Sequence, residues 1–154
     1  MTNSELVVRV LIEGAIGGAL ISIVAFLLSR FAADVAGRAF LVIFLMTATG
    51  AYFGFVVVAQ AGLLWILIEL SHIIAFGTMG LLGLRGSAHW LAAGWALHPV
   101  WDIGLHYIGP GTFAPWTYAI ACATFDLAVA AYIELAYVII GPHRLHFRNP
   151  IRAN

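Results

Sequence analysis

Long apolar runs dominate this chain and leave little room for any fold other than one that spans a membrane. Five apolar stretches of about twenty residues each are separated by short polar or Gly/Pro-rich connections. Each stretch is long enough for an α-helix to cross the hydrocarbon core of a bilayer. It is also too long and too evenly apolar for a strand of a membrane barrel. Of the 154 residues, 63% are hydrophobic and only 9% are charged, so a water-soluble domain is excluded.

We therefore predict an all-α fold, a polytopic membrane helix bundle of about five transmembrane helices in a single domain, 1–154. The expected spans are roughly 6–28, 39–59, 62–84, 88–108 and 116–140. Six of the seven arginines fall on one side of this arrangement, and only Arg9 lies on the other. The positive-inside rule then predicts the N-terminus outside and the C-terminus inside, and we expect a bacterial inner (plasma) membrane.

Charge and cysteine content exclude several classes of function. Seven arginines balance seven acidic residues, so no net positive field would attract nucleic acid. The single cysteine, Cys122, cannot form an intrachain disulfide or a multi-cysteine metal site. The first ten residues lack the basic leader of a cleavable signal peptide, so we expect a retained first helix. The expected partners are bilayer lipid and a lipid-soluble small molecule.

Glycines recur at the spacings that close helix packing requires. The sets are Gly14 with Gly18, Gly50 with Gly54, and Gly77, Gly80 and Gly83. Small residues let helix backbones approach closely in lipid, where van der Waals contact replaces the missing hydrophobic drive. We expect these glycines to pack helices together, and such surfaces also leave a homo-oligomer open.

Ionisable side chains inside the predicted spans are the most informative feature for function. They are Glu13, Glu69, Asp102, Asp126, Glu134, His72, His98 and His106. An ionisable group near the bilayer centre costs about 3 kcal/mol or more, so it is usually paired or functional. At a rise of about 1.5 Å per residue, most of these groups fall roughly 10–15 Å from the outer ends of their helices. Metal ions, protonation or internal pairing must neutralise this slab of charge.

Two local patterns place histidine and carboxylate on shared helix faces. His98, Asp102 and His106 follow one another at intervals of four residues and form one polar stripe. Glu69 and His72 have the Glu-x-x-His spacing found in di-iron carboxylate bundles. Imidazole and carboxylate groups are ligands for zinc, iron and manganese. The patterns therefore predict a divalent metal site with one or two ions, zinc or iron being the main candidates.

We assign provisional roles to these residues. The predicted metal ligands are His72, His98, Asp102 and His106. The predicted catalytic residues are Glu69 and Asp126, as acid/base groups or further ligands. The residues left outside the site are His89, Glu134, His143 and His146.

Structural interpretations remain open for several of these groups. Arg9 and Glu13 are four residues apart and can pair with each other. Asp102 can orient a histidine instead of binding a metal. Asp126 can be a hydrogen-bonded strut between two helices. The polar stripe can also be a structural network or part of a path for ions or protons.

The segment GWALHPVWDIGLH, followed by P-W and C-A-T-F-D, resembles a family of small integral membrane proteins of unassigned function. The matching residues are Gly94, Trp95, His98, Trp101, Asp102, His106, Pro115, Trp116, Cys122 and Asp126. The resemblance covers about the last two spans. It implies a multi-helix membrane protein and draws attention to the histidines and acids of these spans, but it supplies no reaction. Leu105 stands where the family pattern has a second histidine beside His106, which leaves the number of ligands open.

The favoured function is a membrane-embedded, metal-dependent hydrolase or oxidoreductase that acts on an isoprenoid, a fatty acyl or a quinone-like molecule. A metal-free acid/base isomerase or cyclase could use the same residues. A different class is a proton or cation channel or transporter in which they form a relay. A purely structural subunit is a third class, for which five buried acids would be costly.

Overall fold

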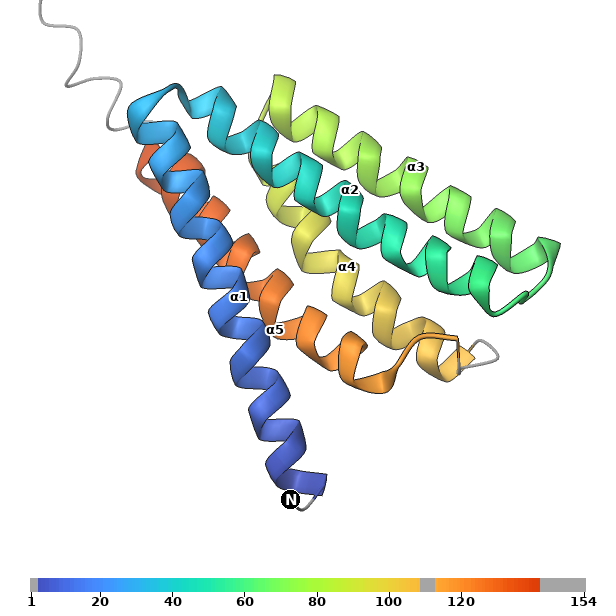
Figure 1. The fold of residues 1–154 in the computed structure, drawn as a ribbon. Coiled ribbons are helices and arrows are strands. Elements are labelled where there is room, and N and C mark those ends of the chain that lie inside the picture. Colours follow the sequence, from blue (N-terminus) through green and yellow to red (C-terminus); the bar gives the residue numbers. More distant parts are fainter. Residues whose placement is uncertain (1–2, 109–112, 142–154) are drawn as a thin grey trace, which may run out of the picture.

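Five long α-helices make up the described part of the fold (Figure 1). The computed structural model describes residues 3–108 and 113–141, with side chains up to residue 105 and again from residue 113. The helices are α1 (Asn3–Phe31), α2 (Asp34–Val58), α3 (Leu63–Arg85), α4 (His89–Ile108) and α5 (Trp116–Ile133), which continues as a π-helical segment, η1 (Glu134–Ile139). No strand occurs in these ranges, which confirms the all-α prediction.

Four of the five predicted spans are long and apolar enough to cross a membrane: α1, α2, α3 and α5 with η1. The exception is α4, which has sufficient length, 20 residues, but contains His98, Pro99 and Asp102 in its middle. These residues lower its mean hydropathy, although both ionisable groups are buried. The exposed face of α4 is still apolar, with Val100 64% and Ile103 42% exposed. α4 therefore has a lower mean hydropathy than the other helices because the ionisable residues in its middle face the interior of the bundle.

Local interactions tie two helix connections together at one end of the bundle. Arg38, in the second turn of α2, donates from Nη1 to the carbonyl oxygens of Gly83 and Gly86 at 3.0 and 3.3 Å. It thereby satisfies carbonyl groups that the end of α3 leaves free. At the opposite end, the turn between α2 and α3 uses positive φ angles at Gln60 (50°) and Gly62 (93°).

Glycines determine how closely α1 approaches α5. A side-chain carbon on Gly14 or Gly18 would collide with the backbone carbonyl of Ala121 or Phe125. The hydroxyl of Thr124 also donates to a backbone carbonyl of α1 at 2.8 Å. The prediction that this glycine pair packs helices is confirmed.

The other two glycine sets differ from each other. Gly77 and Gly80 face α2 and Gly83 faces α4, so this series also packs helices as predicted. A side-chain carbon on Gly50 or Gly54 would meet no described atom within 4 Å. The expectation that this pair packs helices is therefore wrong within this chain, because the pair lies on the face of α2 that points away from its buried residues.

The helices pack side by side in the order α2, α3, α4, α5 and α1, and α1 leaves α2 at an angle (Figure 1). α1 packs along α5, α5 against α4, α4 against α3, and α3 against α2. α1 and α2 are close near their connection, where Gly37 lies against Ala25 and Ser29, and they diverge beyond it. The side chains buried in the bundle include Leu41, Leu45, Leu91, Trp95, Val129 and Ile133.

Candidate functional site

α4 turns its predicted polar stripe toward the interior of the bundle. His98 and Asp102, one helical turn apart, are both completely buried. His106 continues the stripe along α4, but its side chain lies outside the described residues. The structure therefore describes the side chains of two of the three residues in this stripe, His98 and Asp102.

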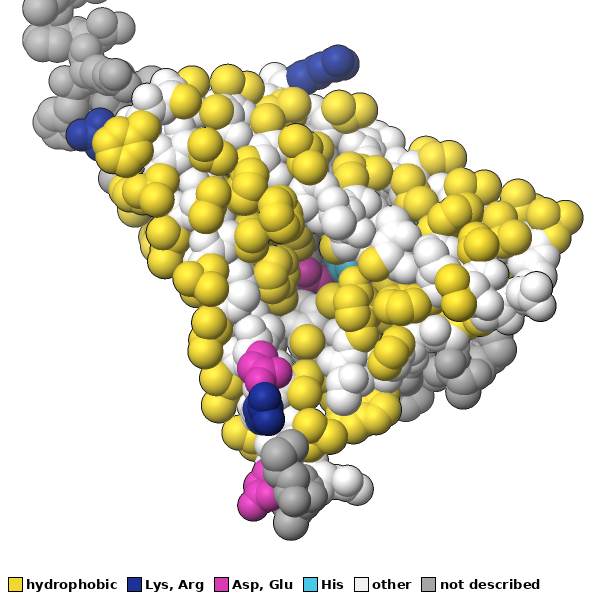
Figure 2. All heavy atoms as spheres, in the orientation of Figure 1, with side chains coloured by type: hydrophobic (Ala, Val, Ile, Leu, Met, Phe, Trp, Pro, Cys, Tyr) yellow, Lys and Arg dark blue, Asp and Glu magenta, His cyan; other side chains and the backbone are white. Residues whose placement is uncertain are grey.

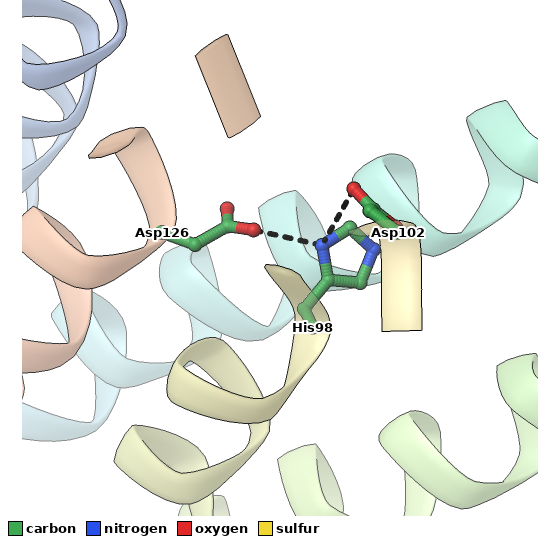
Figure 3. A group of neighbouring side chains, drawn as sticks. All are labelled: His98, Asp102 and Asp126. Carbon is green, nitrogen blue, oxygen red and sulfur yellow. Dashed lines mark hydrogen bonds and ion pairs between the residues drawn. The ribbon is translucent and has the colours of Figure 1, made fainter. Parts of the chain in front are cut away.

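His98 lies between two carboxylates, one from its own helix and one from α5 (Figure 3). Its Nδ1 atom is 2.8 Å from Oδ2 of Asp126 and 3.6 Å from Oδ2 of Asp102. One candidate ligand atom from each of the three residues lies within 4.8 Å of the others. The ligands of a tetrahedral ion with bonds of about 2.0–2.2 Å lie roughly 3.3–3.6 Å apart. The three residues, called here the His98 cluster, thus have nearly the spacing that a metal ion requires.

Several atoms of the His98 cluster have no hydrogen-bond partner among the described residues. They are Nε2 of His98, both carboxylate oxygens of Asp102, and Oδ1 of Asp126. All three side chains are at most 1% exposed. A buried charged group without a partner is strongly unfavourable. In their metal-binding forms, two carboxylates and a neutral imidazole, the three side chains would carry a charge of −2, which a divalent cation would balance.

Glu69 and His72 of α3 form a second buried pair beside the cluster. Nδ1 of His72 donates to Oε2 of Glu69 at 3.1 Å, and Nε1 of Trp101 donates to Oε1 of Glu69 at 3.3 Å. The His72 ring stacks on Trp101 and on His98, with centroids 4.6 and 5.3 Å apart. Nε2 of His72 is buried and, within the described structure, has no partner. The pair therefore lies next to the His98 cluster and leaves one nitrogen free.

Five of the six predicted site residues thus meet in one polar core, built by three helices: Glu69, His72, His98, Asp102 and Asp126. Their distribution differs from the provisional roles. Asp126 lies among the three candidate ligands, whereas His72 is paired with Glu69. The division into ligands and catalytic residues stays a prediction.

Two further ion pairs lie away from this core. Arg9 and Glu13 are 2.7 Å apart and both exposed, which confirms the pairing interpretation and takes Glu13 out of the buried set. His89 and Glu134 are 2.6 Å apart, also in a partly exposed position. The two tail histidines lie outside the described residues. The structure thus separates paired ionisable groups at the surface from the buried groups.

Two residues near the cluster were not predicted as site residues. Tyr52 of α2 is completely buried, and its hydroxyl has no hydrogen-bond partner within the described chain. The free thiol of Cys122 interacts with Asp102 and with the hydroxyl of Tyr118. Neither this thiol nor any other described group donates a hydrogen bond to the oxygens of Asp102. The four-residue spacing between Cys122 and Asp126 could have indicated their shared face, whereas nothing in the sequence marks Tyr52.

Comparison with known proteins identifies a family. No curated protein and no solved structure matches the chain. A family of unknown function, DUF6010, matches residues 13–141. The match reaches well beyond the last two helices, on which the sequence resemblance rests, and includes all residues of the polar core. Because the family match covers more than half of the chain, the chain belongs to the DUF6010 family of unknown function.

Proposed function

We propose that this protein is an intramembrane metal-dependent enzyme that acts on a lipid-soluble substrate. One observation carries the proposal: the His98 cluster brings three completely or almost completely buried ligand groups within 4.8 Å of one another. Four of their polar atoms have no partner in the described chain. A bundle that only needed to pack its helices would not require such an arrangement in a low-dielectric interior.

In this proposal His98, Asp102 and Asp126 hold one divalent ion, zinc or iron. Both carboxylates and one ring nitrogen of His98 would be deprotonated in the metal-bound protein, because ligands bind in their deprotonated forms. When bound, the ion would polarise a carbonyl group or activate water. Three protein ligands leave one position of a tetrahedral site open for a reacting group.

The neighbouring pair on α3 provides the acid/base chemistry of the proposal. His72 stacks on His98 and has a free Nε2 atom, while its Nδ1 atom is held by Glu69. A carboxylate that orients an imidazole in this way fixes which nitrogen carries the proton. His72 would therefore move a proton to or from the substrate, with Glu69 as its positioning residue. His106 remains the further candidate ligand on α4.

The proposed orientation places the N-terminus outside and the C-terminus inside a bacterial inner membrane. Arg30 and Arg38 flank the α1–α2 connection, and Arg85 ends α3. The bonds from Arg38 to Gly83 and Gly86 hold these connections at one end of the bundle, so their positive charges gather on one side. The positive-inside rule assigns that side to the cytoplasm.

A metal-free acid/base enzyme is the second candidate, favoured by the 2.8 Å contact between His98 and Asp126. This dyad alone could shuttle a proton during an isomerisation or cyclisation. A transmembrane proton or cation path receives less support. The linked groups run from α3 through α4 to α5, across the bundle, whereas conduction needs sites distributed along it.

Elemental analysis of the detergent-purified protein tests the proposal. We expect about one equivalent of zinc or iron in the parent protein and loss of that metal in Asp126→Asn. The matched control is Glu134→Gln, an acid-to-amide change at a partly exposed position of the same helical segment. It should keep the metal.

Two results would contradict the metal proposal. One is a parent protein without metal even after incubation with zinc, iron and manganese salts. The other is equal metal content in Asp126→Asn and the parent. Either result would favour the metal-free dyad of His98 and Asp126 over the metal site. Ion flux in liposomes would instead favour a proton or cation path.

A further inference from the structure

A hollow interrupts the apolar surface between α1 and α2 (Figure 2). Acidic and histidine side-chain atoms are visible at its bottom, and hydrophobic side chains lie on two sides of it. The acids and histidines of the polar core are at most 1% exposed, so the hollow stops just short of them. In the same orientation, α4 and α5 lie behind this opening (Figure 1). These two helices carry the His98 cluster. The hollow therefore leads from the lipid-facing surface toward the polar core.

The α2 side of the hollow follows from helix geometry. Gly37 faces α1, since a side-chain carbon there would collide with Ser29. Phe44, Ala48 and Ala51 follow Gly37 by 7, 11 and 14 positions, which places all three within about 40° of the same face of α2. The three are only partly buried. Beyond the contact at Gly37, this face of α2 therefore lines the space that the departing α1 leaves open.

The α5 side carries polar groups between the hollow and the cluster. α5 packs on α1 through Ala121 and Phe125, and Asp126 turns toward α4. Tyr118 and Cys122 lie on α5 between the side that packs on α1 and the position of Asp126, and both are partly exposed. Tyr118 also packs against the aromatic rings of α2, which limits the hollow on that side.

The thiol connects this face to the buried carboxylates. Cys122 interacts with Asp102, whose oxygens have no conventional donor in the described chain. A group that passed Cys122 would therefore meet buried oxygen and nitrogen atoms with unused hydrogen-bonding capacity. The hollow thus combines apolar walls with a polar end.

We propose that this hollow admits an acyl or isoprenoid chain sideways from the bilayer and delivers its oxygen-bearing group to the His98 cluster. Apolar walls suit the chain, and the unpartnered atoms at the bottom suit the polar group. The occupant is a lipid because the opening lies in the apolar surface of a membrane bundle, where lipid is the surrounding solvent. This inference rests on the proposed function for the reaction, but lipid binding can be measured without it.

Photo-crosslinking tests the inference. The full chain is reconstituted into phosphatidylcholine vesicles that contain a long-chain fatty acid with a diazirine in its chain, and labelled peptides are mapped by mass spectrometry. We expect labelling of the α5 peptide at Tyr118 and Cys122. Ala48→Trp, which fills the hollow, should lose this labelling. Thr47→Trp adds the same ring to an exposed position one residue away and should keep it.

Each result decides the inference. Equal labelling of the α5 peptide in the two tryptophan variants, or labelling restricted to the outward faces, would overturn it. Ala51→Phe provides a second, smaller obstruction if Ala48→Trp does not fold. A disulfide-linked dimer of Ala48→Cys in a Cys122→Ala background would show a second copy in the hollow and would also overturn it.

Metal content measured on the same samples separates this inference from the proposed function. Bound metal without α5 labelling would support the metal-dependent enzyme and contradict entry of a lipid chain through the hollow. Labelling without metal would leave lateral access standing and favour the metal-free dyad.

Discussion

Asp102→Asn gives opposite consequences for the metal-bound and metal-free protein, and this makes it the most informative single substitution. Asparagine keeps the shape of the side chain but removes a charge and a good metal ligand. Because the oxygens of Asp102 accept no conventional hydrogen bond in the described structure, the amide leaves no former donor without a partner. Without metal, we therefore expect the variant to be at least as stable as the parent.

With metal, the expected difference is large. An ion at 1,000 times its dissociation constant stabilises the folded state by about 4 kcal/mol. For a chain of 154 residues, each kcal/mol shifts the unfolding temperature by roughly 2–4 °C, so the parent should gain about 8–16 °C. Asp102→Asn removes one of three ligands from the cluster and should lose most of that gain.

The assay is thermal unfolding of both proteins in detergent, followed by tryptophan fluorescence with and without added zinc, iron or manganese. Glu134→Gln serves as the acid-to-amide control, since Glu134 lies outside the polar core. Equal metal-induced shifts in Asp102→Asn and the parent would refute the assignment of Asp102 as a ligand. A metal-free variant markedly less stable than the parent would show that the carboxylate of Asp102 stabilises the fold through its contact with His98, although its oxygens accept no hydrogen bond in the described structure.

Two further predictions concern packing and orientation. Gly14→Ala should lower the unfolding temperature, because its added carbon collides with the carbonyl of Ala121. Gly50→Ala adds the same carbon in open space, so the unfolding temperature should stay unchanged or rise, since alanine is more favourable than glycine in a helix by up to about 1 kcal/mol. Equal effects of these two changes in thermal unfolding would contradict the packing described. Gln60→Cys in a Cys122→Ala background should react with a membrane-impermeant thiol reagent from the outer side of intact cells, and labelling only after the inner side is opened would reverse the proposed orientation.

The fold class and the helix positions could be read from the sequence because both depend on local chemistry. A run of apolar residues long enough to cross a bilayer must satisfy its own backbone hydrogen bonds, and a helix does so within the run. The Arg9–Glu13 pair was predictable for the same reason, since residues four apart on a helix are neighbours. The polar stripe of His98 and Asp102 likewise needed only the helical repeat.

Contacts between helices could not be read in this way, because they depend on how each helix is rotated and where the chain brings it. The sequence presented Gly14 and Gly50 as equivalent packing positions, yet among the described residues Gly14 lies against another helix and Gly50 does not. It likewise gave no reason to place Asp126 closer to His98 than His72 lies, or to bring Tyr52 near the site.

Local residue patterns were therefore enough to predict five helices, four of which are long and apolar enough to cross a membrane, and to place histidine and acidic residues within them. The packing of the helices, in contrast, brings Asp126 of α5 to His98 and Asp102 and lets α1 diverge from α2 beyond their connection. The physical reason is that helix formation is set by nearest neighbours along the chain. The joining of residues 28 positions apart is set by the packing of whole helix faces.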